Sequence, residues 1–368
     1  MTQSIYCPMI HGGLHLVAHN NNVYFRHCCL SSCDTAIFSE STWQSLQLNS
    51  LREQNNANNW DSGCNQCKNI ELTNQHSMRT GMLDNFGVKQ NLSGPQRIDL
   101  MFDKSCNLAC RICGPDSSTL WQKHLTQNNI KSYKIENYNS SAEQIILALS
   151  KLDLSNLKMV VMCGGETLMG ANYWKVAEYI ATTGIPQQIT LSFQTNGTQT
   201  INEKYYDLIN RFHLVKLNIS LDGVKEKFNY QRWPADWQQV VSNIFALRES
   251  LPTNVMFLIE ETISIFNLYY QEELSMWVEK NFSTNRLGDM VNHTRHFAQG
   301  SYGLHNLTYE YIDALQKKNL LNYVNDDFVE NPIEIKSMIS TIKQFDLIRN
   351  EDFSKIFPEV AEFYSRYI

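Results

Sequence analysis

The stretch that decides the fold is residues 98–113, IDLMFDKSCNLACRIC. It opens with the apolar run 98–102, which predicts a buried β-strand, and it closes with Cys106, Cys110 and Cys113. Three thiols in so short a loop form a compact site for a soft metal. Structural zinc prefers four ligands, usually in two pairs, and this loop offers three. Three ligands to a four-iron cluster leave one iron open, so the spacing favours an iron–sulfur site.

Downstream of this loop, short apolar runs alternate with amphipathic helices. This alternation predicts an α/β fold, in which a parallel sheet is covered by helices. Six such units predict a partial (β/α)6 barrel with its chemistry at the carboxyl ends of the strands. The predicted strands are 98–102, 158–162, 189–194, 215–221 and 255–259, with a weaker sixth at 289–293. The predicted helices are 142–152, 173–182, 203–212, 237–248 and 272–281.

The segments on either side of the predicted barrel differ from it in pattern. Residues 1–95 hold six of the ten cysteines, have weak periodicity and are rich in Asn and Gln. We expect this part to be an irregular cysteine-rich region that needs a metal cluster for stability. We assign residues 96–300 to the barrel and residues 301–368 to a helical C-terminal extension.

Composition excludes several classes of protein. The chain has 31 Lys and Arg against 37 Asp and Glu, a net charge of −6, which disfavours a nucleic-acid partner. No run approaches the ~20 apolar residues that span a bilayer, and the N-terminus lacks the pattern of a secretion signal. We therefore expect a cytoplasmic protein without a membrane partner. In a reducing compartment, closely spaced cysteines favour metal ligation over disulfides.

The spacing of Cys106, Cys110 and Cys113 resembles the CxxxCxxC signature of radical S-adenosylmethionine (radical SAM) enzymes, as does its place after the first strand. Ile112 departs mildly from that signature, which usually has an aromatic residue there. The resemblance implies a 4Fe–4S cluster whose open iron chelates S-adenosylmethionine. It also implies reductive cleavage of this cofactor to a 5′-deoxyadenosyl radical, which takes hydrogen from a substrate. A low-potential donor such as flavodoxin or ferredoxin would supply the electron.

Polar or glycine residues follow the next predicted strands, where they could simply form turns. Two glycines at a strand end also permit close approach by a ligand, because no Cβ intervenes. In the family, the Gly-Gly-Glu segment binds the amino group of the cofactor. By resemblance, Arg232 pairs with the cofactor carboxylate, Ser220 contacts its ribose or carboxylate, and Asn196 contacts its ribose. The cofactor-binding residues implied are Gly164, Gly165, Glu166, Asn196, Ser220 and Arg232.

A second set of cysteines lies in the N-terminal region. Cys7 precedes a predicted hairpin that turns at residues 20–22 and leads to Cys28, and Cys64 and Cys67 follow later. Asn in the turn is tolerant of left-handed geometry. Zinc is an alternative here, with three histidines nearby, His11, His15 and His27.

This region resembles the auxiliary-cluster modules of radical SAM enzymes, called SPASM and twitch, although those are usually C-terminal. In them, the first cysteine precedes a hairpin that ends in the second. The implied ligands of a second iron–sulfur cluster, expected to be of the 4Fe–4S type, are Cys7, Cys28, Cys64 and Cys67. Cys29 and Cys33 are the alternatives.

The substrate is implied only by the resemblance. Enzymes with auxiliary clusters often modify peptides, so we expect a peptide or protein substrate. A small molecule, a sugar or a nucleotide-derived substrate is the alternative within the family. A non-catalytic zinc-binding or redox-sensing protein is the alternative from another class.

Overall fold

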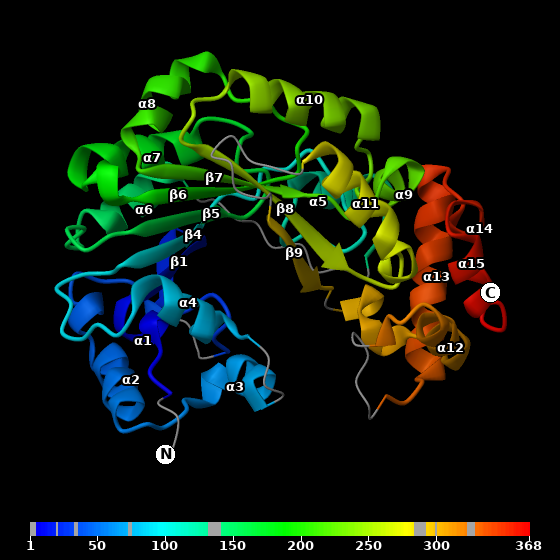
Figure 1. Ribbon diagram of the computed structural model, residues 1–368, viewed down its shortest axis with the longest axis horizontal. Helices are drawn as coiled ribbons and strands as arrows, with labels where there is room; N and C mark the ends of the chain where they lie inside the picture. The colour runs from blue at the N-terminus through cyan, green and yellow to red at the C-terminus, as the bar shows by residue number, and fades with distance from the viewer. Residues whose placement is uncertain are drawn as a thin grey trace.

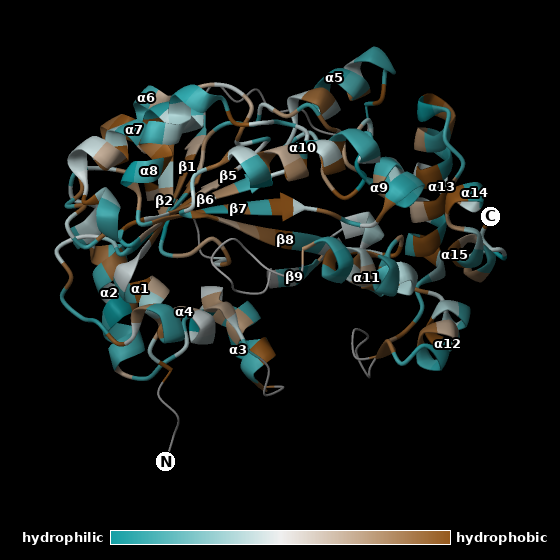
Figure 2. Cartoon of the chain, turned by 45° about the horizontal axis from the view of Figure 1, so that its top comes forward, coloured by the Kyte–Doolittle hydropathy of each residue, from teal (hydrophilic) through white to brown (hydrophobic). Residues whose placement is uncertain are grey.

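The computed structural model describes residues 5–19, 21–32, 36–72, 76–131, 141–282, 292–298, 300–321 and 328–368. A nine-stranded sheet runs through the molecule in the order β3-β2-β1-β4-β5-β6-β7-β8-β9 (Figure 1). In Figure 2 the strands carry much of the hydrophobic colour, while the helices carry both colours. The helices therefore bury one side against the sheet and expose the other.

Six neighbouring strands of this sheet pair in parallel, as the sequence predicts. They are β4 (Arg97–Met101), β5 (Met159–Cys163), β6 (Thr190–Thr195), β7 (Leu214–Ser220), β8 (Val255–Ile263) and β9 (Asn292–Phe297). The sixth strand lies later than predicted, and residues 289–291 fall outside the described part of the chain. The helices between these strands are α5 (Thr119–Gln127), α6 (Ala142–Leu149), α7 (Asn172–Thr183), α8 (Tyr206–Arg211), α9 (Lys225–Gln231), α10 (Trp237–Ser250) and α11 (Gln271–Asn281).

The five predicted helices are confirmed, whereas α5 and α9 were not predicted. Strands and helices pack through alternate apolar residues: Val215 and Leu217 of β7 share one core with Val240 of α10. Figure 1 shows α7, α8 and α10 over one face of the sheet. Because the strands are parallel, their carboxyl ends meet at one edge of the sheet.

The N-terminal region is more regular than we predicted. It contains the strands β1 (Gly13–His19), β2 (Asn22–Arg26) and β3 (Ala36–Ile37), and the helices α1 (Pro8–Gly12), α2 (Leu46–Asn56), α3 (Asn65–Leu72) and α4 (Met78–Phe86). The predicted hairpin is β1–β2, and Asn21 at its turn has a φ of 62°. α1 escaped prediction because it is only one turn long, although all of it is buried, whereas α2, α3 and α4 bury few side chains, and α3 buries none.

The boundary predicted at residue 95 does not divide the sheet. β1 pairs in parallel with β4, with Leu14 beside Ile98 and Leu16 beside Leu100. These four side chains are fully buried in one common core. The β1–β2 hairpin is therefore an extension of the parallel sheet, and the cysteine-rich region shares the hydrophobic core of the rest of the molecule.

The described C-terminal part of the chain is helical. It consists of α12 (Tyr309–Lys317), α13 (Pro332–Arg349), α14 (Phe353–Ile356) and α15 (Pro358–Phe363), which build a second core with the end of β8. Figure 1 shows α13 close to α9. Short 3₁₀ helices link other elements: η1 (Thr42–Gln44), η2 (Ser62–Cys64), η3 (Pro186–Gln188), η4 (Glu203–Tyr205), η5 (Leu268–Tyr270), η6 (Gly300–Tyr302) and η7 (Leu304–Asn306).

None of the helices in the described part of the chain has the length and hydropathy needed to cross a membrane.

Candidate functional site

The loop after β4 brings three thiols together. Cys110 and Cys113 are linked by a side-chain hydrogen bond, which raises the pKa of Cys110 and lowers that of Cys113. Burial, together with the charge of the neighbouring Cys110, raises the pKa of Cys106 to about 11. Cys110 and Cys113 are therefore in contact, and Cys106 lies near enough for its charge to influence theirs. Two of these thiols are held more strongly in the protonated form than usual, so a bound metal would have to displace their protons.

The start of α5 supports this loop. Trp121 Nε1 donates to the carbonyl oxygen of Cys110 at 2.8 Å, and Ser118 Oγ donates to that of Leu108 at 2.5 Å. The backbone N–H of Cys106 donates to Thr119 Oγ1 at 3.2 Å. Ser118 and Thr119 cap and begin α5, a common pattern at the start of a helix. This local pattern does not indicate that the two side chains contact the cysteine loop.

The two glycines after β5 allow the approach of the chain itself. The N–H of Gly165 donates to the carbonyl oxygen of Asp103 at 2.9 Å. A Cβ on Gly165 would lie 2.4 Å from the carbonyl oxygen of Ser105, and one on Gly164 would lie 2.4 Å from that of Asp103. The segment that leads into Cys106 therefore packs against this strand end.

Glu166 ties the ends of β5 and β6 together. Its carboxylate is 1% exposed and accepts hydrogen bonds from Thr195 Oγ1 at 2.7 Å, Asn196 N at 2.6 Å and Leu168 N at 3.0 Å. Burial raises the pKa of Glu166, although these bonds oppose the shift. Both of its oxygens are occupied, so the side chain orients the backbone around it.

Asn196 connects the end of β6 to the cysteine loop. Its Nδ2 donates to Asn107 Oδ1 at 3.1 Å and to Cys106 Sγ at 3.9 Å. Its Oδ1 accepts from the hydroxyl of Thr198, which also receives a bond from Asn107. This network makes the carboxyl ends of β4 and β6 one polar unit.

Arg232 lies at the end of α9, beside the same thiols. It is 6% exposed, and its Nη2 is 2.7 Å from Asp222 Oδ2. Burial alone would lower the pKa of Arg232, but the attraction of Asp222 and then of Cys110 raises it above its usual range. Its Nε has no hydrogen-bond partner among the described residues. Ser220 ends β7, where it pairs with Glu260 of β8. The site thus holds a fixed guanidinium next to its thiols, and the Nε of this guanidinium is available to a ligand.

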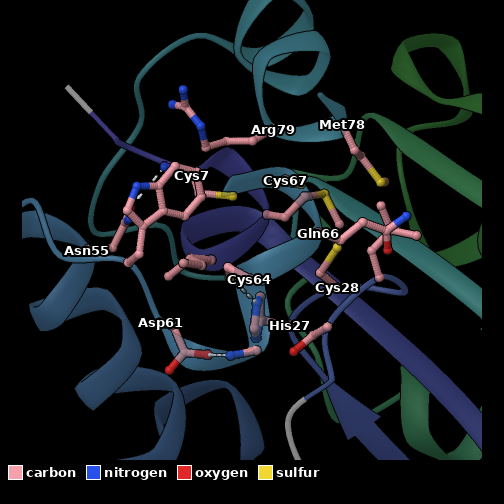
Figure 3. A pocket seen from close by; sticks show the side chains of 16 residues that line it. Cys7, His27, Cys28, Asn55, Asp61, Cys64, Gln66, Cys67, Met78 and Arg79 are labelled. Atoms are coloured by element: carbon pink, nitrogen blue, oxygen red, sulfur yellow. Dashed lines mark hydrogen bonds between the residues drawn. The ribbon is translucent and has the colours of Figure 1, made fainter. Parts of the chain in front are cut away.

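Four N-terminal cysteines, Cys7, Cys28, Cys64 and Cys67, line one pocket (Figure 3). Cys7 precedes α1, Cys28 follows β2, Cys64 ends η2 and Cys67 lies in α3. Burial raises the pKa of Cys7 to about 11. The structure therefore brings together all four residues chosen from the sequence. Apolar side chains complete the wall: Met9, Ile10, Leu30, Trp60 and Met78.

A buried cation stands at this pocket. Arg79 is 3% exposed and forms a forked pair with Glu71, with Nε–Oε1 at 2.8 Å and Nη2–Oε2 at 2.5 Å. Its Nη1 donates to the carbonyl oxygen of Tyr6 at 2.8 Å. The charge of Arg79 favours the thiolate of Cys7, as the charge of Arg232 does in the first site.

Of the three nearby histidines, only His27 lines the pocket. Its Nε2 is 3.7 Å from Cys64 Sγ, and burial lowers the pKa of His27 to about 4. His11 instead contacts Asn55, and His15 lies in β1 beside Asp99. The sequence offered no signal that separates these three histidines.

The two alternative cysteines differ in status. Cys29 does not line the pocket; its Sγ is 4.0 Å from Met78 Sδ. Cys33 lies outside the described residues. Within the described part of the chain, no three His, Cys, Asp or Glu side chains are close enough to hold a single metal ion.

Residues 102–267 match the model of a family described as the radical SAM superfamily. The fold is similar to that of anSMEcpe with bound AdoMet, at 18% identity and a TM-score of 0.39, over 69% of this chain and 62% of that one. This chain thus spans less than two thirds of anSMEcpe. It is also similar to Streptococcus suis SuiB bound to the precursor peptide SuiA, at 10% identity and a TM-score of 0.39, over 93% and 75% of the two chains. For coproporphyrinogen III oxidase (HemN) from Escherichia coli the values are 12%, 0.34, 68% and 51%. A search of curated proteins found no match.

Proposed function

We propose that this protein, whose residues 102–267 match the radical SAM superfamily model, is an enzyme that uses S-adenosylmethionine and an iron–sulfur cluster, and that Cys106, Cys110 and Cys113 hold this cluster. The observation that carries the proposal is the placement of the three thiols in one loop after β4, where Cys110 and Cys113 are hydrogen-bonded, Cys106 influences the ionisation of Cys113, and the buried Arg232 lies beside them. Thiolates are the ligands that such clusters require, and three of them leave one iron free. When bound, the cluster and S-adenosylmethionine would supply reductive cleavage to a 5′-deoxyadenosyl radical, which removes hydrogen from a substrate.

We propose that Arg232 binds the carboxylate of S-adenosylmethionine. Its pairing with Asp222 holds the guanidinium in one orientation, and its Nε has no hydrogen-bond partner among the described residues. A forked guanidinium suits a carboxylate in a partly buried site. Polar groups at the neighbouring strand ends complete the proposed cofactor site, with Ser220 and Asn196 toward the ribose and the backbone of Gly164 and Gly165 toward the amino group. Glu166 would act by holding this backbone.

We propose that Cys7, Cys28, Cys64 and Cys67 bind a second cluster of the 4Fe–4S type. The support is their shared pocket, which is apolar apart from a few polar groups and is flanked by the cation Arg79. A low-potential protein such as flavodoxin or ferredoxin is the proposed electron donor.

The proposed substrate is a peptide or protein, which the enzyme modifies. The support is the resemblance of the N-terminal cysteine pattern to auxiliary-cluster modules, which often accompany peptide modification. Modification of a small molecule and not of a peptide would contradict this proposal.

The test of the enzyme is anaerobic reconstitution with iron, sulfide, dithionite and S-adenosylmethionine, followed by measurement of 5′-deoxyadenosine. The native chain should produce it, and Cys106→Ala, Cys110→Ala and Cys113→Ala should not. Cys163→Ala is the matched control, because its thiol bonds to the carbonyl oxygen of Leu100, and it should remain active. Full production by any of the three variants would overturn the ligand assignment.

The test of the cofactor site is Arg232→Met, which removes the guanidinium. Its iron content should equal that of the native protein, while its affinity for S-adenosylmethionine should fall by roughly 10²-fold, since one partner of a buried charged pair is lost. Anaerobic titration calorimetry measures the affinity. Arg248→Met, in α10, is the control, and unchanged affinity in Arg232→Met would contradict the assignment.

A further inference from the structure

The end of α13 lies against the loop that carries Cys106, Cys110 and Cys113, although the contacts join residues 235 to 240 apart in sequence. Arg349, the last residue of α13, donates from Nη2 to the carbonyl oxygen of Ala109 at 3.0 Å. Its guanidinium lies over the rings of Trp121, Trp233 and Phe345, at 4.9, 4.7 and 5.0 Å. Arg349 is therefore packed between the loop and the C-terminal helices.

Arg111, inside the loop itself, is fixed by the same segment. Its side chain is 1% exposed, and its Nη2 lies 2.5 Å from Asp346 Oδ1 and 2.7 Å from Glu351 Oε2. The guanidinium stacks 3.7 Å from the ring centre of Tyr230, whose hydroxyl also donates to Asp346. The neighbour of Cys110 in sequence thus has both of its carboxylate partners in the C-terminal segment.

These contacts restrain the loop strongly. The other oxygen of Asp346 accepts from the backbone N–H of Phe353 at 2.7 Å, so the carboxylate cannot turn away from Arg111 freely. Displacing the loop would leave Arg111 and its partners buried without compensation, which is unfavourable in a protein interior. The loop and the α13–α14 junction should therefore move as one unit.

Arg349 also places a charge near a proposed ligand. Burial, and then repulsion by Arg111, lowers the pKa of Arg349 to about 10, which leaves it charged at neutral pH. Its guanidinium donates to the carbonyl oxygen of Ala109, the residue before Cys110, so its charge lies close to that proposed ligand. Reduction of a cluster adds a negative charge, and a nearby buried cation stabilises that charge.

We propose that residues 345–353 are a positioning element for the catalytic cluster, in which Arg349 and the Arg111–Asp346–Glu351 set hold residues 106–113 in place. Arg349 further favours the reduced cluster through its charge. The inference rests on the proposed function of Cys106, Cys110 and Cys113. It assigns to the C-terminal helices a role at a site whose cysteines lie more than 200 residues earlier in the sequence.

The experiment uses reconstituted Arg349→Met and, as a matched control, Lys336→Met, which removes a cation from the exposed side of the same helix. The first measurement is the rate at which iron leaves the protein in a chelator. The second is the midpoint potential of the catalytic cluster. This cluster is recognised as the one whose electron paramagnetic resonance signal changes when S-adenosylmethionine is added. Arg349→Met should lose iron several-fold faster and have a lower potential, while Lys336→Met should match the native protein.

Arg349→Lys separates the two effects, since lysine keeps the charge without the forked contact. It should restore the potential toward the native value but recover only part of the cluster retention. A folded Arg349→Met protein with native iron loss and native potential would overturn the proposal.

If Arg349→Met does not fold, Glu351→Gln replaces it as the test, because it neutralises one of the two carboxylates that pair with Arg111. This variant should lose iron several-fold faster than the native protein, and native retention would contradict the inference. Iron loss requires no cofactor cleavage. If the native protein holds its cluster but makes no 5′-deoxyadenosine, the proposed function is refuted, while the proposed positioning role is still tested by the rate of iron loss.

Discussion

Cys28 and Cys29 are neighbours in sequence, but only Cys28 lines the N-terminal pocket. The two residues lie in a turn closed by the hydrogen bond from Ser31 N to Cys28 O, and since only one of them faces the pocket, we expect the other to be dispensable. Because Cys29 contacts Met78 instead, we predict that Cys28→Ala loses the second cluster and that Cys29→Ala keeps it. Iron and acid-labile sulfide are measured in a chain that already lacks the three loop cysteines. Loss of iron from Cys29→Ala alone would reverse the assignment.

His15 should make the stability of the protein depend on pH. It is 2% exposed, and neither ring nitrogen has a hydrogen-bond partner among the described residues. Burial lowers the pKa of His15 to about 4, although Asp99 opposes this. The unfolded chain takes up the proton near pH 6.5, so the stabilisation is complete above that pH and is lost as the pH falls toward 4.

When the pH is lowered from 7.5 to 5.5, the free energy of unfolding should decrease in the native protein because His15 resists protonation. In His15→Leu this contribution is absent, so we predict that the decrease is smaller by about 1 kcal/mol. Anaerobic guanidinium unfolding at both pH values measures the difference. The exposed His213 provides the control, and His213→Gln should behave as the native chain does. Equal pH dependence in His15→Leu and the native protein would contradict the prediction.

At the scale of elements, the junction of α1 and β1 places Gly13 against Met9 and His27, two residues that line the N-terminal pocket. A Cβ there would lie 2.5 Å from Met9 Cε, 2.6 Å from Met9 O and 2.7 Å from His27 O. Two of these atoms belong to the backbone, so the clash cannot be relieved by turning a side chain. Gly13→Ala should therefore destabilise the protein by about 1–3 kcal/mol, as overpacking does, and should reduce the iron content of the pocket.

Gly81 is the matched control for this change. It lies inside α4, and a Cβ at this position would meet no atom within 4 Å. Gly81→Ala should stabilise the protein by about 0.5–1 kcal/mol, because alanine loses less conformational freedom than glycine in a helix. Thermal unfolding of both variants checks the pair. A Gly13→Ala protein as stable as Gly81→Ala would show that the α1–β1 junction tolerates the extra atom.

The elements that the sequence predicted are those with strong apolar periodicity. β7 and α10 bury alternate or one-sided apolar residues, so a short window of sequence is enough to find them. α5 buries Trp121, His124 and Leu125 within TLWQKHLTQ, where polar residues mask the pattern. α3 buries none of its side chains, and its position therefore depends on neighbours that a local window does not contain.

At the scale of the molecule, the two cysteine sites are built from separate parts of the sheet. The first follows β4, whereas the second lies beyond the β1–β2 hairpin, among α1, η2 and α3. A chain lacking Cys106, Cys110 and Cys113 should therefore still bind about four iron and four sulfide per molecule. Removing Cys64 and Cys67 as well should abolish this binding. Zinc without acid-labile sulfide in the first variant would identify the N-terminal site as a zinc site.

The sequence by itself determined the parallel strands, the cysteine triplet at the carboxyl end of the first of them, and the four cysteines that line the N-terminal pocket. These features are local, since they follow from apolar periodicity and from short spacings. Only the tertiary structure decided that β1 continues the parallel sheet, that Gly165 accommodates Ser105, and that Arg349 contacts Ala109. Each of these contacts joins residues far apart in sequence. Which residues meet in such contacts depends on packing and on the pairing of buried polar groups. Neither produces a periodic pattern in the sequence.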